Sequence, residues 1–471
     1  MERLYRLAPN GVGLLPLAGD GGLGLWEVAR AAGAPAAVLL PPLWDHHGHV
    51  VPLGRSFDEA DLRRCPSPEA AAEEARRVAA PRPAGAWVQG FGWDQNLWGG
   101  RFPHRRLLDQ VLPGRPVLLW RIDGHAAWAS TEALRRAGLL EGLSDPPGGA
   151  IQREEGLPTG ILLDAAAEAV RAAVPPPSLE DLERWILQGL HTLAARGLSG
   201  VTDMGLEPRE AEVFQRLDDE GYLPLAVRGF LRVSPGDPLP EAPPNEGHLF
   251  RIEGFKFFAD GALGSRGAAL HEDYADAPGC RGLLLWETEA LREGLRWAAA
   301  RGARVAVHAI GDRALRQVLD AALPLHLGSA LRIEHVQVAG EEEVALLAAS
   351  GATASIQPCH RLSDEGWAPL RLGERRAHAY RVASLARAGI PLLFGTDFPI
   401  EEADPLRTLA AAVLHREGEA LPLFRALMAM APPPGAPCRR PALLLLDRVP
   451  SPGDPRWLLG GRTAPLPDPV P

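Results

Sequence analysis

The sequence has almost no lysine. Its 471 residues include 49 basic side chains, and every one of them except Lys256 is an arginine. This single amine lies in an apolar stretch, RIEGFKFFAD, that is typical of a β-strand. Arginine keeps its proton in proteins, whereas a buried lysine can lose its proton. We therefore expect this position to require an amine, and a charge at the surface or at the substrate is the alternative.

The marks of several protein classes are also absent. No apolar run approaches the roughly 18 to 20 residues that cross a membrane, and the start MERLYRLAPNGVGLL does not resemble a secretory signal. We therefore expect a cytoplasmic protein without membrane contacts. The four cysteines form no CxxC pair, so neither a zinc finger nor a disulfide framework is expected for Cys65, Cys280, Cys359 and Cys438.

The charge of the chain limits its partners. The formal net charge is -10, and no long basic run interrupts the sequence. Proteins that bind nucleic acids usually carry basic patches, so a nucleic-acid partner is not expected. We predict a small-molecule substrate as the partner, and the association of two chains into a homodimer stays open.

Short apolar segments alternate with longer segments of helical period. Such alternation is typical of βαβ units with a parallel sheet. The eight strand candidates span residues 37–45, 198–203, 224–233, 251–258, 303–308, 331–335, 352–357 and 391–397. Helices are expected between them, at 178–196, 287–301, 312–322, 340–350 and 377–388. We predict an α/β fold, a distorted TIM (β/α)8 barrel, in which chemistry takes place at the carboxyl ends of the strands.

Other parts of the chain fall outside the barrel. The gap between the first two strand candidates, about 150 residues, is far longer than a barrel connection needs. We predict an inserted lobe at about 52–175, with strands at 85–90 and 115–122 and helices at 67–80 and 130–137. Residues 1–36 and 436–471 are expected to pair as a small β unit, which leaves 37–435 for the barrel with its lobe.

Histidines follow three of the strand candidates. Asp45, His47 and His49 are spaced by two, so their side chains share one face of an extended segment, where two imidazoles can hold one metal ion. His308 and His335 each end a later strand. A single histidine at a strand end is more often structural, and the HxH segment could be a polar loop. Two histidines at equivalent strand ends, together with HxH, favour a metal site.

Two further residues complete this set. Asp397 follows the eighth strand candidate, where a carboxylate could bind a metal and accept a proton from water; its alternative role is to cap the next helix. An ammonium group at Lys256 would be repelled by metal ions. A neutral lysine amine can instead react with carbon dioxide, and the resulting carbamate could bridge two metals about 3.5 to 4 Å apart.

Together with longer motifs, these residues resemble the amidohydrolase superfamily. Within it, the sequence is similar to the YtcJ-like branch, the amidohydrolase 3 group that includes N-substituted formamide deformylases. The similar motifs are GFGWDQNLW, LLWRIDGHAAWAS, DPPGGAIQREEGLPTGILLD, KFFADGALGSRGAAL, HAIGDRA, RIEHVQ, SIQPCHRLSDEGW and FGTDFPIEEADP, which lie between about Pro41 and Pro405. The C-terminal segment RALMAMAPPPGAPCRRPALLLLD is shorter than the family pattern, so a reduced β-sandwich is expected.

The resemblance implies a TIM-like barrel with one or two divalent metals, usually zinc. It implies that His47 and His49 hold one metal and that His308 and His335 hold the other. Lys256 would bridge them as a carbamate, and Asp397 would be ligand and base. The implied reaction is hydrolysis of an amide or other non-peptide C–N bond of a small molecule by metal-activated hydroxide.

Several residues are candidates for contact with the substrate. They are Trp93, Asp94, Asp123, His125, Ser265, Arg266 and His360. Trp93 could equally lie in the core of the lobe. A deaminase or a cyclic-amide hydrolase would use the same metal site, and a non-catalytic binding or regulatory barrel is a further alternative. Loss of metal ligands would be the sign of such a barrel, and none is missing here.

Overall fold

The computed structural model describes most of the chain, in two compact units. The described residues are 3–7, 14–16, 36–122, 126–141, 144–146, 149–240, 247–415, 418–437, 442–446, 458 and 461–464. One unit comprises Met1–Val51 and Leu182–Pro471, and the other is Pro52–Asp181. Asp123, His125 and Cys438 lie outside the described residues.

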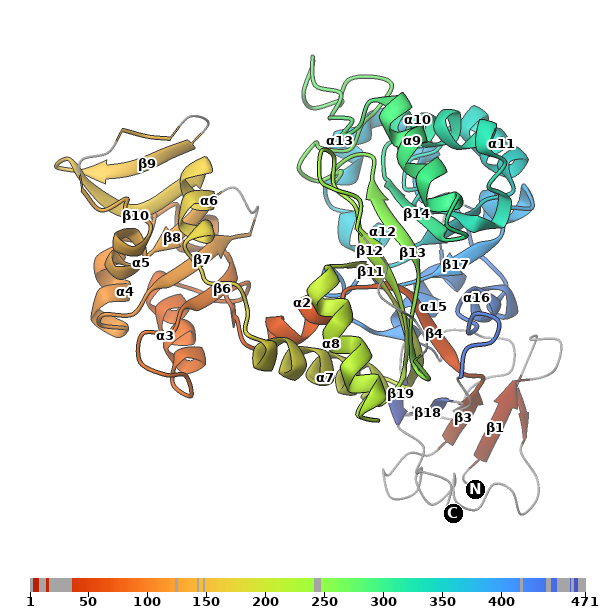
Figure 1. The fold of residues 1–471 in the computed structure, drawn as a ribbon, viewed down its shortest axis with the longest axis horizontal. Coiled ribbons are helices and arrows are strands. Elements are labelled where there is room, and N and C mark those ends of the chain that lie inside the picture. Colours follow the sequence, from red (N-terminus) through yellow and green to blue (C-terminus); the bar gives the residue numbers. More distant parts are fainter. Residues whose placement is uncertain are drawn as a thin grey trace. The chain divides into compact units, whose positions relative to one another are not determined.

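The larger unit contains an eight-stranded parallel sheet (Figure 1). Its strands follow one another in chain order, each paired with the next. They are β4 (Leu43–Gly48), β11 (Leu198–Leu206), β12 (Ala226–Arg232), β13 (Phe250–Phe258), β14 (Arg304–Ala309), β15 (Leu331–His335), β16 (Thr353–Ile356) and β17 (Leu392–Phe394). With helices between the strands, this arrangement confirms the predicted distorted α/β barrel.

The sheet nearly closes where the segment after β17 meets β4. The backbone N–H of Asp397 donates to the carbonyl of His47 at 2.7 Å, and that of His49 donates to the carbonyl of Phe398 at 3.0 Å. Gly395 permits this approach, because a Cβ atom there would lie 2.3 Å from the backbone nitrogen of His47. Closure therefore brings the HxH segment against Asp397, although the two are far apart in the sequence.

The first predicted strand is wrong in one respect. Residues 37–45 belong to two strands, β3 (Ala36–Leu40) and β4, which Pro41 and Pro42 separate. Proline has no N–H to donate to a sheet, so the pair of prolines ends one ladder before the next begins.

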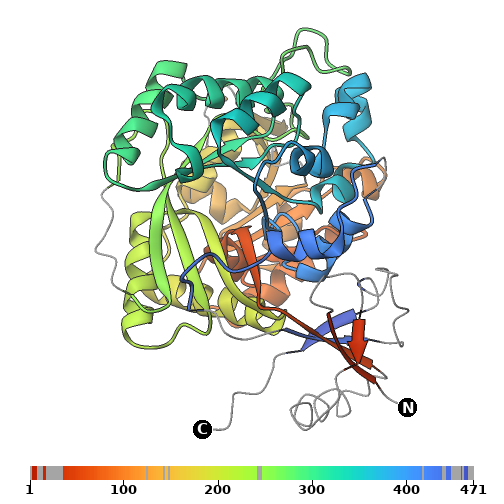
Figure 2. The same ribbon diagram turned by 90° about the vertical axis from the view of Figure 1, so that its right-hand side faces the viewer.

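Strand β3 belongs to a five-stranded sheet built from both ends of the chain. Its order is β19-β18-β3-β1-β2, with β1 at Arg3–Leu7, β2 at Leu14–Pro16, β18 at Ala442–Leu446 and β19 at Gly461–Ala464. Figure 2 shows the red N-terminal and blue C-terminal strands side by side. The described end segments thus form one sheet, and the predicted sandwich and its bounds stay predictions.

Amphipathic helices surround the barrel. In α10 (Asp312–Ala322), for example, Leu315, Val318, Leu319 and Ala322 are buried at helical spacing. The other helices of this unit are α8 (Pro208–Asp219), α9 (Thr288–Ala299), η3 (Leu323–Leu325), η4 (Gly328–Ala330), α11 (Glu341–Ser350), α12 (His360–Asp364), α13 (Ala368–Leu372), η5 (Gly373–His378), α14 (Val382–Arg387), α15 (Pro405–Val413) and α16 (Leu423–Ala429). Two helices cross the boundary between the units along the chain, α2 (Val50–Ser56), mostly in the smaller unit, and α7 (Leu179–Ala195), mostly in the larger one.

The helix predicted at 377–388 is shorter in the structure. It begins only at Val382, because Tyr380 has a φ of 56°, which is in the left-handed region and interrupts the helix. None of the described helices has both the length and the apolar character that crossing a bilayer would demand.

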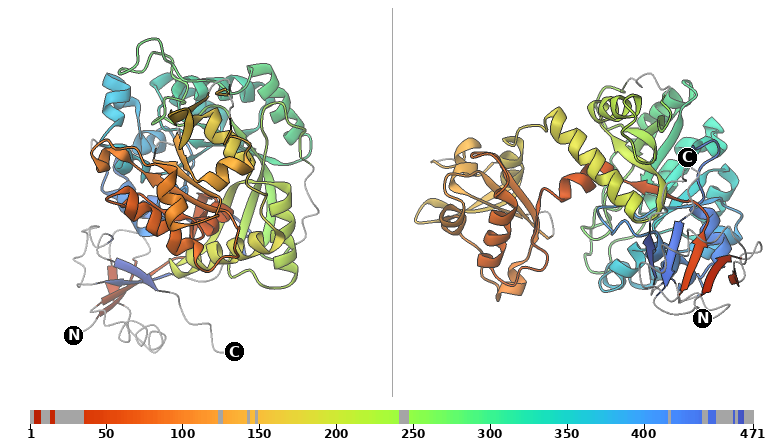
Figure 3. Two further views of the ribbon diagram at one scale, coloured as in Figure 1. Left: turned by 90° about the vertical axis from the view of Figure 1, so that its left-hand side faces the viewer. Right: turned by 90° about the horizontal axis from the view of Figure 1, so that it is seen from below.

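The smaller unit is a lobe with its own sheet of six strands, in the order β5-β6-β7-β8-β10-β9. The strands are β5 (Ala60–Asp61), β6 (Val88–Trp93), β7 (Val117–Arg121), β8 (Ala126–Ala129), β9 (Gly149–Glu154) and β10 (Leu157–Asp164). The helices are α3 (Pro68–Ala79), η2 (Gln95–Trp98), α4 (Arg105–Val111), α5 (Thr131–Arg136) and α6 (Ala165–Ala172). Figure 3 shows these helices packed on the orange and yellow strands.

Side chains of the lobe's sheet alternate between two apolar cores. In β7, Leu119 packs with α3 and α4, whereas Leu118 packs with α5 and α6. In β8, Trp128 joins the first core and Ala127 joins the second. This period of two follows from the pleat of a strand, and it shows a sheet that is covered by helices on both faces.

Candidate metal centre

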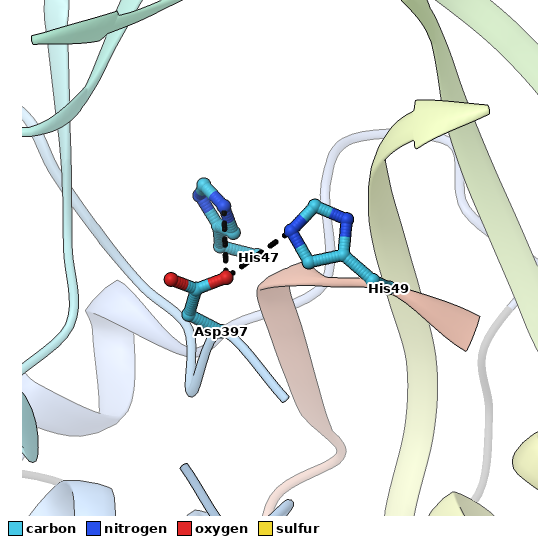
Figure 4. Close-up of side chains that lie close together, drawn as sticks. All are labelled: His47, His49 and Asp397. Atoms are coloured by element: carbon cyan, nitrogen blue, oxygen red, sulfur yellow. Dashed lines mark ion pairs between the residues drawn. The ribbon is translucent and has the colours of Figure 1, made fainter. Parts of the chain in front are cut away.

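Asp397 lies at the centre of a group of histidines. Its Oδ1 atom lies 3.4 Å from Nε2 of His47 and 3.2 Å from Nε2 of His49 (Figure 4). Its Oδ2 atom lies 3.3 Å from Nε2 of His360. Burial alone would raise the pKa of this carboxyl group, but the nearby imidazoles, with His47 foremost, hold the pKa of Asp397 well below its usual range. Asp397 is therefore ionised at neutral pH.

The remaining predicted histidines lie beside this group. The ring centroid of His335 is 4.9 Å from that of His47 and 4.5 Å from that of His308. Ligand-type atoms cluster in two sets whose members lie within 4.8 Å of one another, one of His47, His49 and Asp397, and one of His335, His360 and Asp397. Carboxylate Asp397 belongs to both sets, so the geometry offers positions for two ions.

Lys256 is buried among these groups. The residue is 1% exposed, and Nζ has no hydrogen-bond partner among the described residues. Burial lowers the pKa of Lys256 to about 8, although Glu334 and Asp397 act in the opposite direction. Burial also lowers the pKa of His308 to about 3, and the charge of Lys256 contributes in the same direction. The barrel thus holds a neutral imidazole close to an amine that loses its proton easily.

Glu334 is a functional candidate that the sequence analysis missed. Its Oε2 atom lies 2.6 Å from Nδ1 of His47, and its Oε1 atom accepts from Nε of Arg332 at 2.5 Å. Arg332 also donates to the carbonyl of His46 at 2.7 Å and to Oγ of Ser355 at 2.9 Å. The sequence did contain a signal, because the strand candidate LRIEH carries an arginine and a glutamate at alternate positions just before His335.

Glu334 therefore orients His47. A metal-binding histidine commonly donates its second ring N–H to a carboxylate, which fixes the tautomer and the ring. Burial raises the pKa of a carboxyl group, but the charge of Arg332 and the hydrogen bond with His47 hold the pKa of Glu334 well below its usual range. The carboxylate stays charged, and Nε2 of His47 stays directed at Asp397.

Three other buried carboxylates hold the loops of the site. Asp45 accepts from Oγ1 of Thr396 at 2.7 Å and from the backbone of Thr396 at 3.1 Å, so it joins β4 to the end of β17. Asp203 accepts from the backbone N–H of Val50 at 2.7 Å. Asp260, which lies 3.4 Å from Nε2 of His308, accepts from three backbone N–H groups. The sequence placed Asp45 and Asp203 at the ends of strand candidates and Asp260 just after one, but it did not show their partners.

The backbone is strained at two of the predicted ligands. His335 has a φ of 73° and Asp397 a φ of 61°, in a region that residues other than glycine rarely adopt. Such strain persists only where the surroundings hold it, and it gathers at functional sites. Here it coincides with the residues that end β15 and follow β17.

These residues fit a divalent metal ion. Imidazole nitrogens and a carboxylate are the donors that zinc and related ions prefer. Among the described residues, Nζ of Lys256 and Nδ1 of His335 are buried without a hydrogen-bond partner, an arrangement that costs free energy unless another group compensates. The predicted ligands His47, His49, Lys256, His308, His335 and Asp397 gather in one place, while their individual roles stay predictions.

The predicted substrate contacts of the lobe have other roles within it. Trp93 is fully buried, donates from Nε1 to the carbonyl of Leu119 at 2.7 Å and stacks on Trp98 at 5.8 Å. Its placement therefore matches the alternative role in the lobe core and does not support a contact with substrate. Asp94 caps η2 by accepting from the backbone of Asn96, and it lies 3.3 Å from Arg121.

The candidates of the larger unit differ from one another. Ser265 donates to the carbonyl of Ala262 at 3.3 Å, and Arg266 pairs with Asp276 at 2.9 Å; both are exposed at least in part. His360 is instead largely buried, with 12% of its side chain exposed, and contacts Asp397. The structure thus brings His360 into the histidine group, and contact of Ser265 or Arg266 with substrate stays a prediction.

Comparison with known proteins agrees with this geometry. The sequence model of the amidohydrolase family matches residues 35–432. The chain is 31% identical to YtcJ of Bacillus subtilis, over 83% of this chain and 78% of that protein. It is 27% identical to the N-substituted formamide deformylase of Arthrobacter pascens, over 84% of this chain and 78% of that enzyme. A crystal structure of an uncharacterized metal-dependent hydrolase from Pyrococcus furiosus is 28% identical, with a TM-score of 0.71, and covers 91% of this chain and 94% of its own.

Proposed function

From the premise that the chain belongs to the amidohydrolase family, in its YtcJ-like group, and is a metal-dependent hydrolase, we propose that it cleaves an amide or related non-peptide C–N bond of a small molecule. The name of the Arthrobacter pascens relative supports N-substituted amides, formamides included, as the first substrates to examine. One or two divalent ions, with zinc as our first choice, would be the cofactor.

The observation that carries the proposal is the environment of Lys256. The only lysine of the chain is buried, its Nζ has no partner among the described residues, and its pKa is lowered to about 8. A neutral amine can take up carbon dioxide to give a carbamate, which is an anionic ligand for metals. A surface charge or a simple ion pair would not require this burial, so we favour N-carboxylation of Lys256.

Each residue of the site would then have a distinct role. His47 and His49 would hold one ion, and His308 and His335 the other. Lys256 and Asp397 would each contact one ion or both. A bound divalent ion lowers the pKa of water and polarises a carbonyl oxygen. Glu334 keeps the ring of His47 in place, and Asp45 keeps Thr396 and thereby the Asp397 segment against β4.

Asp397 would move the proton. As an ionised carboxylate among imidazoles, it can accept a proton from the attacking water while the water oxygen bonds to the carbonyl carbon. The same carboxyl group would then deliver this proton to the leaving nitrogen as the C–N bond breaks. The products are a carboxylic acid and an amine, and the carboxylate is regenerated.

Metal content by plasma mass spectrometry, together with hydrolysis of a panel of N-alkyl and N-aryl formamides, acetamides and cyclic amides, tests the proposal. We expect about two ions per chain in the wild type and fewer in Lys256→Ala, with loss of hydrolysis. Lys256→Arg is the matched control, since it keeps a positive charge but cannot form a carbamate, and it should behave like Lys256→Ala. A wild-type chain that binds no ion and stays inactive after addition of zinc or manganese with bicarbonate would contradict the proposal.

A further inference from the structure

We propose that His360 is a metal ligand, in addition to the histidines at the ends of β4, β14 and β15. It would bind the ion held by His335, through Nε2, and share that ion with Oδ2 of Asp397. This inference rests on the proposed function, because it concerns the second of the two ion positions. It replaces the prediction that His360 contacts the substrate.

The two oxygens of Asp397 face two different groups of histidines. Oδ1 faces His47 and His49 at 3.4 and 3.2 Å, and Oδ2 faces His360 at 3.3 Å. The distance between Nε2 of His360 and Oδ2 of Asp397 thus matches the distances between the HxH imidazoles and Oδ1. Since the HxH imidazoles are predicted ligands of one ion, the matching placement of His360 indicates the same role at the second position.

The distances around Asp397 suit ligands better than hydrogen bonds. Two atoms bound at about 2.0 to 2.1 Å to one tetrahedral ion are roughly 3.3 Å apart. A charge-assisted N–H to O hydrogen bond is shorter, at about 2.7 to 2.9 Å. The same site contains a contact of the shorter kind, because Nδ1 of His47 lies 2.6 Å from Glu334. The contacts of Asp397 with His47, His49 and His360 all span 3.2 to 3.4 Å.

The outer nitrogen of His360 is also placed as in a metal ligand. Nδ1 faces Oε1 of Glu401 at 3.4 Å, a longer contact than the 2.6 Å between His47 and Glu334, and the side chain of Glu401 is only 6% exposed. His47 has the same arrangement, because its Nδ1 contacts the carboxylate of Glu334 while its Nε2 faces Asp397. A carboxylate on the outer nitrogen directs the inner nitrogen at the ion and raises its basicity.

His335 completes this position. Its ring is stacked on that of His360, with 6.0 Å between the centroids, and its Nδ1 atom has no hydrogen-bond partner among the described residues. The two histidines come from successive parts of the barrel, since His335 ends β15 and His360 begins the helix after β16. Ligand-type atoms of His335, His360 and Asp397 lie within 4.8 Å of one another, so one ion could contact all three side chains.

The alternative is that His360 only donates a hydrogen bond to Asp397. His360→Gln separates the two roles, because the glutamine amide reaches the place of Nε2 and can donate to Asp397 but is a poor ligand for zinc. His360→Asn keeps an amide near the place of Nδ1, beside Glu401, but leaves no group at the place of Nε2, which faces Asp397. His271→Gln is the matched control, since His271 also faces a glutamate, Glu343 at 3.3 Å, but belongs to neither cluster.

The experiment is titration of the chelator-treated full chain with Zn²⁺, and with Co²⁺ followed by its visible absorption. We expect both His360 variants to bind one of the two ions at least about tenfold more weakly and to change the cobalt spectrum, while His271→Gln matches the wild type. Wild-type affinity and spectrum in His360→Gln would overturn the inference and leave the proposed function intact. A wild-type chain that takes up no ion would overturn both.

Discussion

The barrel unit and the lobe bury different kinds of side chain. In the lobe, Ser130 and Thr159 are the buried polar residues among those described, and the two cores are otherwise apolar. The barrel unit buries ionisable groups of every kind. They include Asp45, His47, Asp203, Lys256, Asp260, Arg332, Glu334, His335 and Asp397.

This difference suggests that the interior of the lobe serves stability, whereas the interior of the barrel unit also holds the reactive groups. Burial of an ionisable group costs free energy unless other charges, hydrogen bonds or a metal compensate it. The lobe avoids this cost and is held by apolar packing on both faces of its sheet. In the barrel, Lys256 and the imidazoles are buried near the ends of the strands despite this cost. Substitutions in the two units should therefore change different quantities.

The largest effect is expected at the shared carboxylate of the barrel. Asp397→Asn removes the group that accepts and returns the proton, so kcat should fall by about 10²- to 10⁴-fold. Steady-state kinetics on a substrate from the amide panel measure it. Asp109→Asn, at a carboxylate of the lobe that accepts from Thr131, is the matched control and should leave kcat unchanged. Equal losses in both variants would remove the distinction between the two units.

Removal of the carboxylate behind His47 should change both stability and metal binding. Glu334→Gln leaves Arg332 buried without its ion pair, which costs about 3 to 5 kcal/mol of the free energy of unfolding. Loss of the partner of His47 should weaken metal binding about 10- to 100-fold. Denaturant unfolding and zinc titration report the two effects.

A double variant sharpens this prediction. Arg332→Met with Glu334→Leu replaces the buried pair by apolar groups of similar size, so much of the stability should return. Metal affinity should stay low, because His47 still lacks its carboxylate. Recovery of both properties in the double variant would contradict the orienting role of Glu334.

In the lobe, Trp93→Phe should change stability alone. The substitution reduces the packing against Trp98 and leaves the carbonyl of Leu119 without its donor, at a cost of about 1 to 3 kcal/mol. Metal content and the KM of a retained substrate should not change. A raised KM with unchanged stability would restore Trp93 as a substrate contact.

The smallest effect on stability is expected at the exposed pair of Arg266 and Asp276. Surface ion pairs contribute little, so Arg266→Ala should leave the thermal midpoint unchanged. If Arg266 contacts the substrate as predicted, KM should rise while metal content stays constant. An unchanged KM would remove Arg266 from the substrate-binding residues.

The sequence was most informative where local pattern and position coincide. Apolar strands that end in His308 and His335, and the HxH segment after an apolar run, predicted the carboxyl edge of a barrel, since parallel strands end at the same edge. The first strand was predicted less well, because the apolar character of residues 37–45 hid the break at Pro41 and Pro42.

The chain by itself determined which residue types stand at the strand ends, and one lysine among 49 basic residues already indicated the need for an amine. Only the tertiary structure decided which atoms face one another. Glu334 reaches His47 across 287 positions of sequence, and His360 meets the second oxygen of Asp397. Such contacts depend on barrel closure and on loop conformation, which arise from the packing of the whole unit. A local pattern of apolar and polar residues does not contain them.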